Sequence, residues 1–487
     1  MAAVSPKSSA VTRIIVLMLL LSVGAILESA RLSALRDDQV WGHLRVGAWI
    51  LENKTWPVTG IFSQAQNLVW RDFSWGYDVV VATGYRLLGL RIVESLLMGF
   101  RVTLAALTFI LAGGARGNFW NSIGLSAVAQ YILGTIGPVA ACSSILFFGI
   151  ELLFLLEGLR RANARALYAL PALFLLWANL DIGFVYGIAL YALFLAGLAV
   201  EKRKSLNESS GKIFVAKAWL VGACCAVASV TTPYGYHSYA AFFAEETSVA
   251  NRYLPGYTSM AFHQPQDYVL LLLTMAAFLS LGLRRVRSFF LLAALSACAA
   301  LAFHAQKDGW LVVVAAVALI GEGIPVANQK PAGGGYAIWR WQALAVAGLA
   351  TAVVSLAFLR VPRNREQLLA RVAENHPVAA CDYIRKHCLP APLFNSYRWG
   401  SFLTWYLPEY PVAVDARRGL YPEEVETSYF QVMNAEMPYQ NFPPIVRAHT
   451  LLLSKLDVMG EALRATPGFR VVYEDSISIA LIQELAE

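Results

Sequence analysis

The sequence predicts an all-α polytopic membrane domain followed by a small α/β domain. Hydrophobic residues make up 57% of the chain and charged residues only 15%, whereas a soluble domain carries about 25% charged residues. Long apolar runs recur up to residue 360, as membrane helices require; they include 14–27, 140–156, 269–281 and 311–320. Beyond residue 360 the apolar stretches shrink to strand length, which marks a change of domain.

The segment 75–90 decides the expected topology. It contains Asp78 and Arg86 and is short enough to be either a span or a helix on the membrane surface. Only a surface helix places the later basic clusters in the cytoplasm, as the positive-inside bias requires. These clusters are Arg116, Arg160/Arg161/Arg165, Lys202-Arg203-Lys204, Arg284/Arg285/Arg287 and Lys330. We therefore expect a multi-pass membrane protein with a cytoplasmic amino terminus and an extracytoplasmic C-terminal domain; the family resemblance described below implies the bacterial inner (cytoplasmic) membrane.

This topology gives about eleven transmembrane helices in a membrane domain at 1–360. The expected spans lie near 14–30, 93–113, 118–136, 141–158, 165–180, 182–200, 213–231, 267–284, 287–304, 308–324 and 340–360. Two outer loops, 31–92 and 232–266, interrupt them. The α/β domain is expected at 361–487, with strands at 393–394, 412–414, 450–453, 469–473 and 478–482 and helices at 366–372, 377–385, 423–432 and 460–464. No glycine-rich phosphate loop follows a strand, so we expect no nucleotide site.

The first outer loop carries the strongest indication of chemistry. Arg36, Asp37 and Asp38 follow the first apolar run directly. Adjacent carboxylates repel each other, and each raises the pKa of its neighbour. Such a pair suits a general base or a metal ligand. The alternative is a solvated acidic loop that caps a helix end.

Four further charged residues lie in or beside the expected spans. Arg101 and Glu151 fall within spans, and a structural ion pair between them is the favoured interpretation. Asp181 is either a third carboxylate at the outer site or the N-cap of the span that begins at 182. Lys307, in a tight outer turn, offers a cation to a phosphate group, unless the turn is simply polar.

Five segments carry a resemblance to a known family. They are Asp37–Gly47 (DDQVWGHLRVG), 177–179 (WAN), 233–235 (PYG), 394–400 (FNSYRWG) and 414–417 (VDAR). With these segments the chain resembles the GT-C glycosyltransferase superfamily. It is most similar to an unassigned bacterial branch akin to protein O-mannosyltransferases and lipid A aminoarabinose transferases.

The resemblance implies an inverting transfer of a hexosyl or pentosyl group from a polyprenyl-phosphate carrier to an acceptor on the outer face of the membrane. Asp37 or Asp38 would be the general base. A cation, Lys307, Arg36 or Arg45, would stabilise the departing phosphate. The remaining substrate-binding candidates are His43, Asp181, Tyr234 and His237. The expected partners are membrane lipid and the lipid-linked donor, with a lipid, glycan or protein acceptor and no nucleic acid.

The chain also departs from the family pattern. Gly60 stands where relatives carry an acid, Asp181 where they carry His, and the second outer loop, 134–140, has no acid. These differences argue against a metal-dependent mechanism, so no cofactor is predicted and a divalent cation remains an alternative. Two other functions stay open: a transporter or flippase of lipid-linked glycan, and a non-catalytic membrane scaffold. Transporters tend to show internal repeats and midplane sites, neither of which is detected here.

Overall fold

The computed structural model describes residues 6–116, 119–202, 209–254, 256–284, 288–323 and 335–484. The chain forms two compact units. The helical unit comprises 1–31, 95–235 and 256–361, and the composite unit comprises 32–94, 236–255 and 362–487. The expected division near residue 360 coincides with a unit boundary, and parts of both expected outer loops group with the tail.

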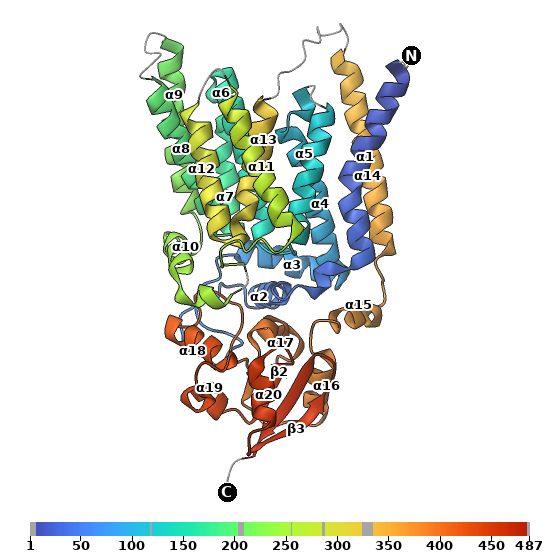
Figure 1. Ribbon diagram of the computed structural model, residues 1–487, viewed down its shortest axis with the longest axis vertical. Helices are drawn as coiled ribbons and strands as arrows, with labels where there is room; N and C mark the ends of the chain where they lie inside the picture. The colour runs from blue at the N-terminus through green and yellow to red at the C-terminus, as the bar shows by residue number, and fades with distance from the viewer. Residues whose placement is uncertain are drawn as a thin grey trace. The chain divides into compact units, whose positions relative to one another are not determined.

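A helix occupies each of the eleven ranges that we expected to span the membrane (Figure 1). The helices are α1 (Pro6–Arg31), α4 (Arg91–Leu111), α5 (Phe119–Ile132), α6 (Ala141–Arg161), α7 (Leu170–Leu180), α8 (Phe184–Lys202), α9 (Ser209–Ser229), α11 (Pro265–Gly282), α12 (Phe289–His304), α13 (Gly309–Gly323) and α14 (Gly335–Arg360). Within the described residues, five of them, α1, α4, α6, α9 and α11, are long and apolar enough to cross a membrane. The count of eleven spans therefore remains a prediction.

Helix α13 is the centre of the helical unit. Every residue from Gly309 to Leu319 is buried, and the helix packs on α5, α6, α11 and α12. A helix that is apolar on all sides needs such an interior position. The residues of α13 therefore lie among other helices rather than facing lipid.

One acidic side chain, that of Glu322, connects the ends of helices in this unit. Glu322 of α13 forms ion pairs with both Arg116 and Arg160, so these two basic residues lie at the same end of the helices, as the topology requires. Arg203, Lys204, Arg285, Arg287 and Lys330 lie outside the described residues.

The expected ion pair between Arg101 and Glu151 is wrong. Arg101 contacts Glu28 of α1 at 3.2 Å and donates a hydrogen bond to the carbonyl oxygen of Gly134 at 2.9 Å. Composition identifies which charges lie deep in the apolar helices, but it cannot identify which helices are neighbours.

The composite unit contains a four-stranded sheet in the order β1-β2-β4-β3. Strand β1 pairs with β2 in parallel, and the other pairs are antiparallel. The strands are β1 (Leu393–Asn395), β2 (Thr450–Ser454), β3 (Phe469–Glu474) and β4 (Ser478–Gln483). The helices of the unit are α2 (Val40–Asn53), α3 (Trp75–Leu88), α10 (His237–Thr247), α15 (Arg365–Val372), α16 (Val378–Lys386), α17 (Gly400–Tyr406), α18 (Glu423–Met433), α19 (Pro443–Val446) and α20 (Val458–Arg464).

Most of the expected tail elements are confirmed. Four of the five expected strands and all four expected helices are present. The exception is the segment 412–414, of which Val412 forms only an isolated bridge with Ser63. The helix expected at 75–90 is α3.

The first outer loop is a folded segment rather than an open solvated loop. It contains α2, whose Val46 and Ile50 join one buried apolar cluster with Trp70 of the same segment and Phe394 and Leu451 of the sheet. Apolar residues recur along one face of α2, and burying them against the sheet removes their surface from water. The segment 32–94 therefore supplies part of the core of the composite unit.

Helices α2 and α3 approach each other closely at Gly47. A Cβ atom at this position would lie 2.0 Å from the backbone oxygen of Asp78 and 2.9 Å from the Cβ of Ala82. Only glycine allows the two backbones to come this near. The turn of α2 that carries His43 is thereby held against α3.

We expect Gly47→Ala to lower the thermal unfolding midpoint of the purified full-length protein. The added methyl group must separate α2 from α3, and overpacking of this kind costs about 1–3 kcal/mol. Gly124→Ala in α5 is the matched control, because a Cβ there meets nothing within 4 Å. Equal midpoints for the two variants would show that α2 and α3 are not packed as described.

Candidate active site

The two adjacent carboxylates lie between the short 3₁₀ helix Ser33–Arg36 and the start of α2. The Oδ1 atom of Asp37 accepts hydrogen bonds from the backbone N–H groups of Gln39 at 2.9 Å and Val40 at 3.2 Å. These are donors that the first turn of a helix leaves unpaired, and an acceptor there also suits the helix dipole. Asp37 therefore has one structural role at the start of α2.

The pKa of the Asp37 carboxyl is raised. Its burial by surrounding protein atoms is the largest cause, and the neighbouring charge of Asp38 acts in the same direction. The hydrogen bonds from Gln39 and Val40 and the nearby His43 oppose the shift. The like-charge effect expected from the sequence is present, but it is smaller than the effect of burial.

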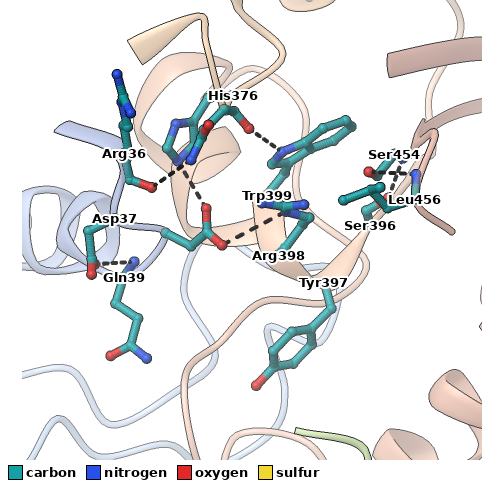
Figure 2. A network of polar contacts seen from close by, with 12 residues as sticks. Arg36, Asp37, Gln39, His376, Ser396, Tyr397, Arg398, Trp399, Ser454 and Leu456 are labelled. Carbon is teal, nitrogen blue, oxygen red and sulfur yellow. Dashed lines mark hydrogen bonds and ion pairs between the residues drawn. The ribbon is translucent and has the colours of Figure 1, made fainter. Parts of the chain in front are cut away.

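Asp38 contacts two side chains of the tail, His376 and Arg398, which Figure 2 shows near the start of α2. Its Oδ1 lies 3.3 Å from Nε2 of His376, and its Oδ2 lies 3.8 Å from Nε of Arg398. His376 is fully buried, and the same Nε2 accepts a hydrogen bond from the indole N–H of Trp41 at 3.0 Å. The Nε2 lone pair is used by the Trp41 indole, and Oδ1 of Asp38 has no hydrogen-bond partner among the described residues, so Asp38 is a close neighbour of the imidazole rather than its hydrogen-bond partner.

The two arginines of this segment already have partners. Arg36 forms an ion pair with Glu374, and both side chains are more than a third exposed. The guanidinium of Arg45 lies 4.5 Å from the centre of the Phe62 ring. Arg417, paired with the buried carboxylate of Asp415, contacts the same ring at 5.8 Å. Asp415 and Arg417 thus form a structural pair, and Arg45 lies beside it.

His43 lies on the first turn of α2 and contacts a pair of buried carboxyls. Its Nδ1 lies 2.6 Å from Oδ1 of Asp78. Asp78 is 2% exposed and Asp72 is 5% exposed, and burial raises the pKa of both carboxyls. Sequence reasoning missed this role of Asp72 and Asp78, and it also missed His376 and Arg398. The only indication available was a charged residue, Asp78, within the short apolar helix 75–88.

The other candidates are divided between the two units. His237 belongs to the composite unit, and its ring stacks on Tyr236 with centres 4.3 Å apart. Asp181, Tyr234 and Lys307 belong to the helical unit. Asp181 accepts hydrogen bonds from the Ser144 hydroxyl and from the backbone N–H of Gly183 at 3.1 Å. This arrangement favours the structural interpretation of Asp181, at the turn between α7 and α8.

Lys307 lines a cavity of about 430 Å³ in the helical unit. Its ammonium nitrogen lies 3.4 Å from the Tyr186 hydroxyl, 3.4 Å from Oδ1 of Asp308 and 5.0 Å from the centre of the Tyr257 ring. Polar side chains at the cavity are His263, Gln264, Gln266, Asp267 and Gln306, and apolar ones include Ile132, Leu133, Ile136, Leu270 and Trp310. A cation beside an apolar wall suits a ligand with an anionic head and a hydrocarbon tail. In the described residues, no group of three or more His, Cys, Asp or Glu side chains is placed to hold a metal ion.

No protein-family model matches the chain, and no curated protein matches it. Among solved structures, it is similar to ArnT from Cupriavidus metallidurans bound to undecaprenyl phosphate, with 14% identity and a TM-score of 0.48. It is also similar to ArnT from the same organism in the apo state, with 13% identity and a TM-score of 0.41. Each alignment covers 98% of this chain and 98% of the other.

We expect Asp37→Asn to be at least as stable as the wild type at pH 8, with the difference vanishing toward pH 4. A carboxyl whose pKa is raised in the folded state loses stability as pH rises from its unfolded value through its folded value. An asparagine keeps the acceptor at the start of α2 without this cost, whereas Asp37→Ala loses the acceptor and about 0.5–2 kcal/mol. Thermal unfolding of the three proteins between pH 4 and pH 8 measures this. If Asp37→Asn is as unstable as Asp37→Ala at pH 8, the charge of Asp37 is structural.

Proposed function

We propose that the protein is a membrane glycosyltransferase that moves a sugar from a polyprenyl-phosphate-linked donor to an acceptor on the outer face of the bacterial cytoplasmic membrane. The observation that carries this proposal is the place of the Asp37 carboxyl at the start of α2 beside Asp38, where its pKa is raised. A carboxyl whose pKa moves toward the working pH is a stronger base than an ordinary solvated one. The motif resemblance of the segment 37–47 supports the same reaction.

The proposed base is Asp37, with Asp38 as the alternative. Asp38 has one oxygen toward His376 and the other toward Arg398, so both of its oxygens face the protein. The Asp37 contacts to Gln39 and Val40 both involve Oδ1. In an inverting step, Asp37 takes the acceptor hydroxyl proton while the acceptor oxygen bonds to the sugar carbon and the bond to phosphate breaks. The bonding electrons leave with the polyprenyl phosphate.

The chemical demand on the protein is modest, because a phosphate is already a good leaving group. Orientation of two substrates and removal of one proton account for the catalysis. In the helical unit, we propose the cavity beside Lys307 as the binding place of the lipid phosphate. The Lys307 ammonium would stabilise its negative charge, and the apolar side chains of the cavity would contact the first part of the hydrocarbon chain.

One observation favours the second candidate, a transporter of lipid-linked glycan. Both carboxyl oxygens of Glu151, in the middle of α6, are buried and have no hydrogen-bond partner among the described residues. An acidic side chain at such a depth is typical of proton-coupled transport proteins.

Mass spectrometry of envelope glycans and glycoproteins tests the proposed transfer. A deletion strain should lose one glycan that returns with the wild type and not with Asp37→Asn. Asp38→Asn should restore it if Asp37 is the base. Glu374→Gln, which removes an exposed partner of Arg36, is the matched control and should restore the glycan fully. Restoration by Asp37→Asn and Asp38→Asn alike would reject an acidic base and favour the transporter.

The proposed orientation can be tested with a native thiol. Cys388, in the tail, is exposed, so a membrane-impermeant maleimide should label it in intact spheroplasts. Cys388→Ser should lose that label. Labelling that appears only after the membrane is permeabilised would place the composite unit in the cytoplasm and contradict the predicted topology.

A further inference from the structure

Lys307 is held in place by the turn that carries it. This turn, the 3₁₀ helix Gln306–Asp308, lies between α12 and α13. Its backbone N–H groups at Gln306 and Lys307 donate hydrogen bonds to the carbonyl oxygens of Thr258 at 3.1 Å and Gly256 at 2.8 Å. The buried start of α13 follows the turn directly. The base of the Lys307 side chain is therefore fixed from both sides.

The carboxylate of Asp308 lies directly beside the Lys307 ammonium. Its Oδ1 is 3.4 Å from Nζ and accepts a hydrogen bond from the Tyr186 hydroxyl at 2.8 Å. Nζ also donates a hydrogen bond to the Tyr186 oxygen at 3.4 Å, so the three groups form a closed triangle. The Asp308 side chain is 4% exposed and that of Lys307 is 24% exposed. Of these two residues, Lys307 lines the cavity and Asp308 does not.

A phosphate that binds to Lys307 must come close to this carboxylate. An ammonium group donates a hydrogen bond to a phosphate oxygen at about 2.7–2.9 Å. Because Nζ is 3.4 Å from Oδ1 of Asp308, that phosphate oxygen lies no more than about 6 Å from Oδ1. Two negative charges at this separation repel each other, and the repulsion is stronger in a site partly closed to water than in bulk water.

The proposed transfer changes the charge of the lipid. A polyprenyl phosphate that carries a sugar is a phosphodiester with one negative charge. During transfer the bond from the sugar carbon to the phosphate oxygen breaks, its electrons stay on that oxygen, and the acceptor proton passes to the base. The remaining lipid is a phosphate monoester, whose second pKa of about 6 gives it close to two negative charges at pH 8.

We propose that Asp308 is a specificity-determining residue that weakens binding of the doubly charged monoester more than binding of the singly charged donor. The second charge of the monoester is attracted by Lys307 and repelled by Asp308, so the carboxylate offsets part of the attraction. Release of the product is thereby favoured, and Lys307 becomes accessible to the next donor. This inference rests on the proposed function, which places the lipid phosphate at Lys307.

Competition between two lipids for the full-length protein tests the proposal. Undecaprenyl phosphate and its methyl ester, a singly charged diester without a sugar, are mixed in equal amounts at pH 8. Native mass spectrometry then measures the ratio of the two bound lipids. Asp308→Asn keeps an oxygen acceptor for Tyr186 but loses the charge, so the ratio should move toward the monoester by about tenfold. Asp308→Ser also loses the charge and should move the ratio in the same direction.

Two controls separate charge from shape. Asp308→Glu keeps the charge and should keep the ratio near its wild-type value. Asp382→Asn is the matched control in the composite unit, because Asp382 likewise lies 3.3 Å from a basic side chain, Arg385, and accepts a tyrosine hydroxyl, that of Tyr406, at 3.1 Å. It should leave the ratio unchanged. A wild-type ratio in Asp308→Asn and Asp308→Ser, or a shift toward the diester, would overturn the proposal.

The inference and the proposed function fail in distinguishable ways. Lys307→Gln should weaken binding of both lipids. Wild-type binding of both lipids to Lys307→Gln would reject the placement of the phosphate, and the role of Asp308 with it. Loss of both lipids in Lys307→Gln, with a wild-type ratio in Asp308→Asn, would retain the placement and reject the role of Asp308. A shifted ratio, together with full glycan restoration by Asp37→Asn and by Asp38→Asn, would retain that role and reject the acidic base.

Discussion

The composite unit depends on the contact between α2 and α3 at Gly47. Because the two backbones touch there, side chains on the facing surfaces are taken out of water, and polar ones must find partners within the protein. His43 and Asp78 become partners for this reason. Burial at the start of α2 likewise raises the pKa of Asp37. The packing that stabilises the unit thus also sets the charge states of the candidate site.

A second constraint comes from the tail. Asp38 reaches His376 and Arg398, and Arg36 reaches Glu374, so the acidic segment is held by residues that follow it by more than 330 positions in the chain. Trp41 occupies the middle of this contact, with the rings of Phe402 and Trp405 packed on it as well as His376. A site that appears in the sequence as one short loop is therefore built from two distant segments.

The helices were predictable because apolar runs of that length leave few alternatives in a bilayer, where each backbone group needs a partner within its own segment. Which strands pair in a sheet, and which charged residues form ion pairs, was not predictable from the same information. The apolar triplet 412–414 fits a strand, yet whether it joins a sheet depends on a neighbour, and Val412 meets only Ser63. Likewise, the sequence places Arg101 within an apolar helix, but only the folded structure shows that its partner is Glu28.

The candidate site shows the same limit. Asp37 and Asp38 are adjacent in the chain, so their mutual effect could be anticipated from the sequence. Asp72 has no acidic residue next to it in the sequence, and the influence of Asp78 on its pKa depends on how the chain folds into α3. His376 lies 335 residues from Trp41, and no local pattern connects the two. Contacts of this kind become visible only in the folded chain.

The shared core of the composite unit has a consequence for biosynthesis. Val46, Ile50 and Trp70 are made early, whereas Phe394 and Leu451, which complete their cluster, are made near the end. At about 5–20 residues per second, translation leaves roughly 20–70 s between them. During that interval Val46 and Ile50 of α2 lack the sheet residues that later cover them, while the remaining helices are still being synthesised. A fragment that begins at Pro362 would lack these early residues, so the tail and the first outer segment are assembled, and have to be produced, as one piece.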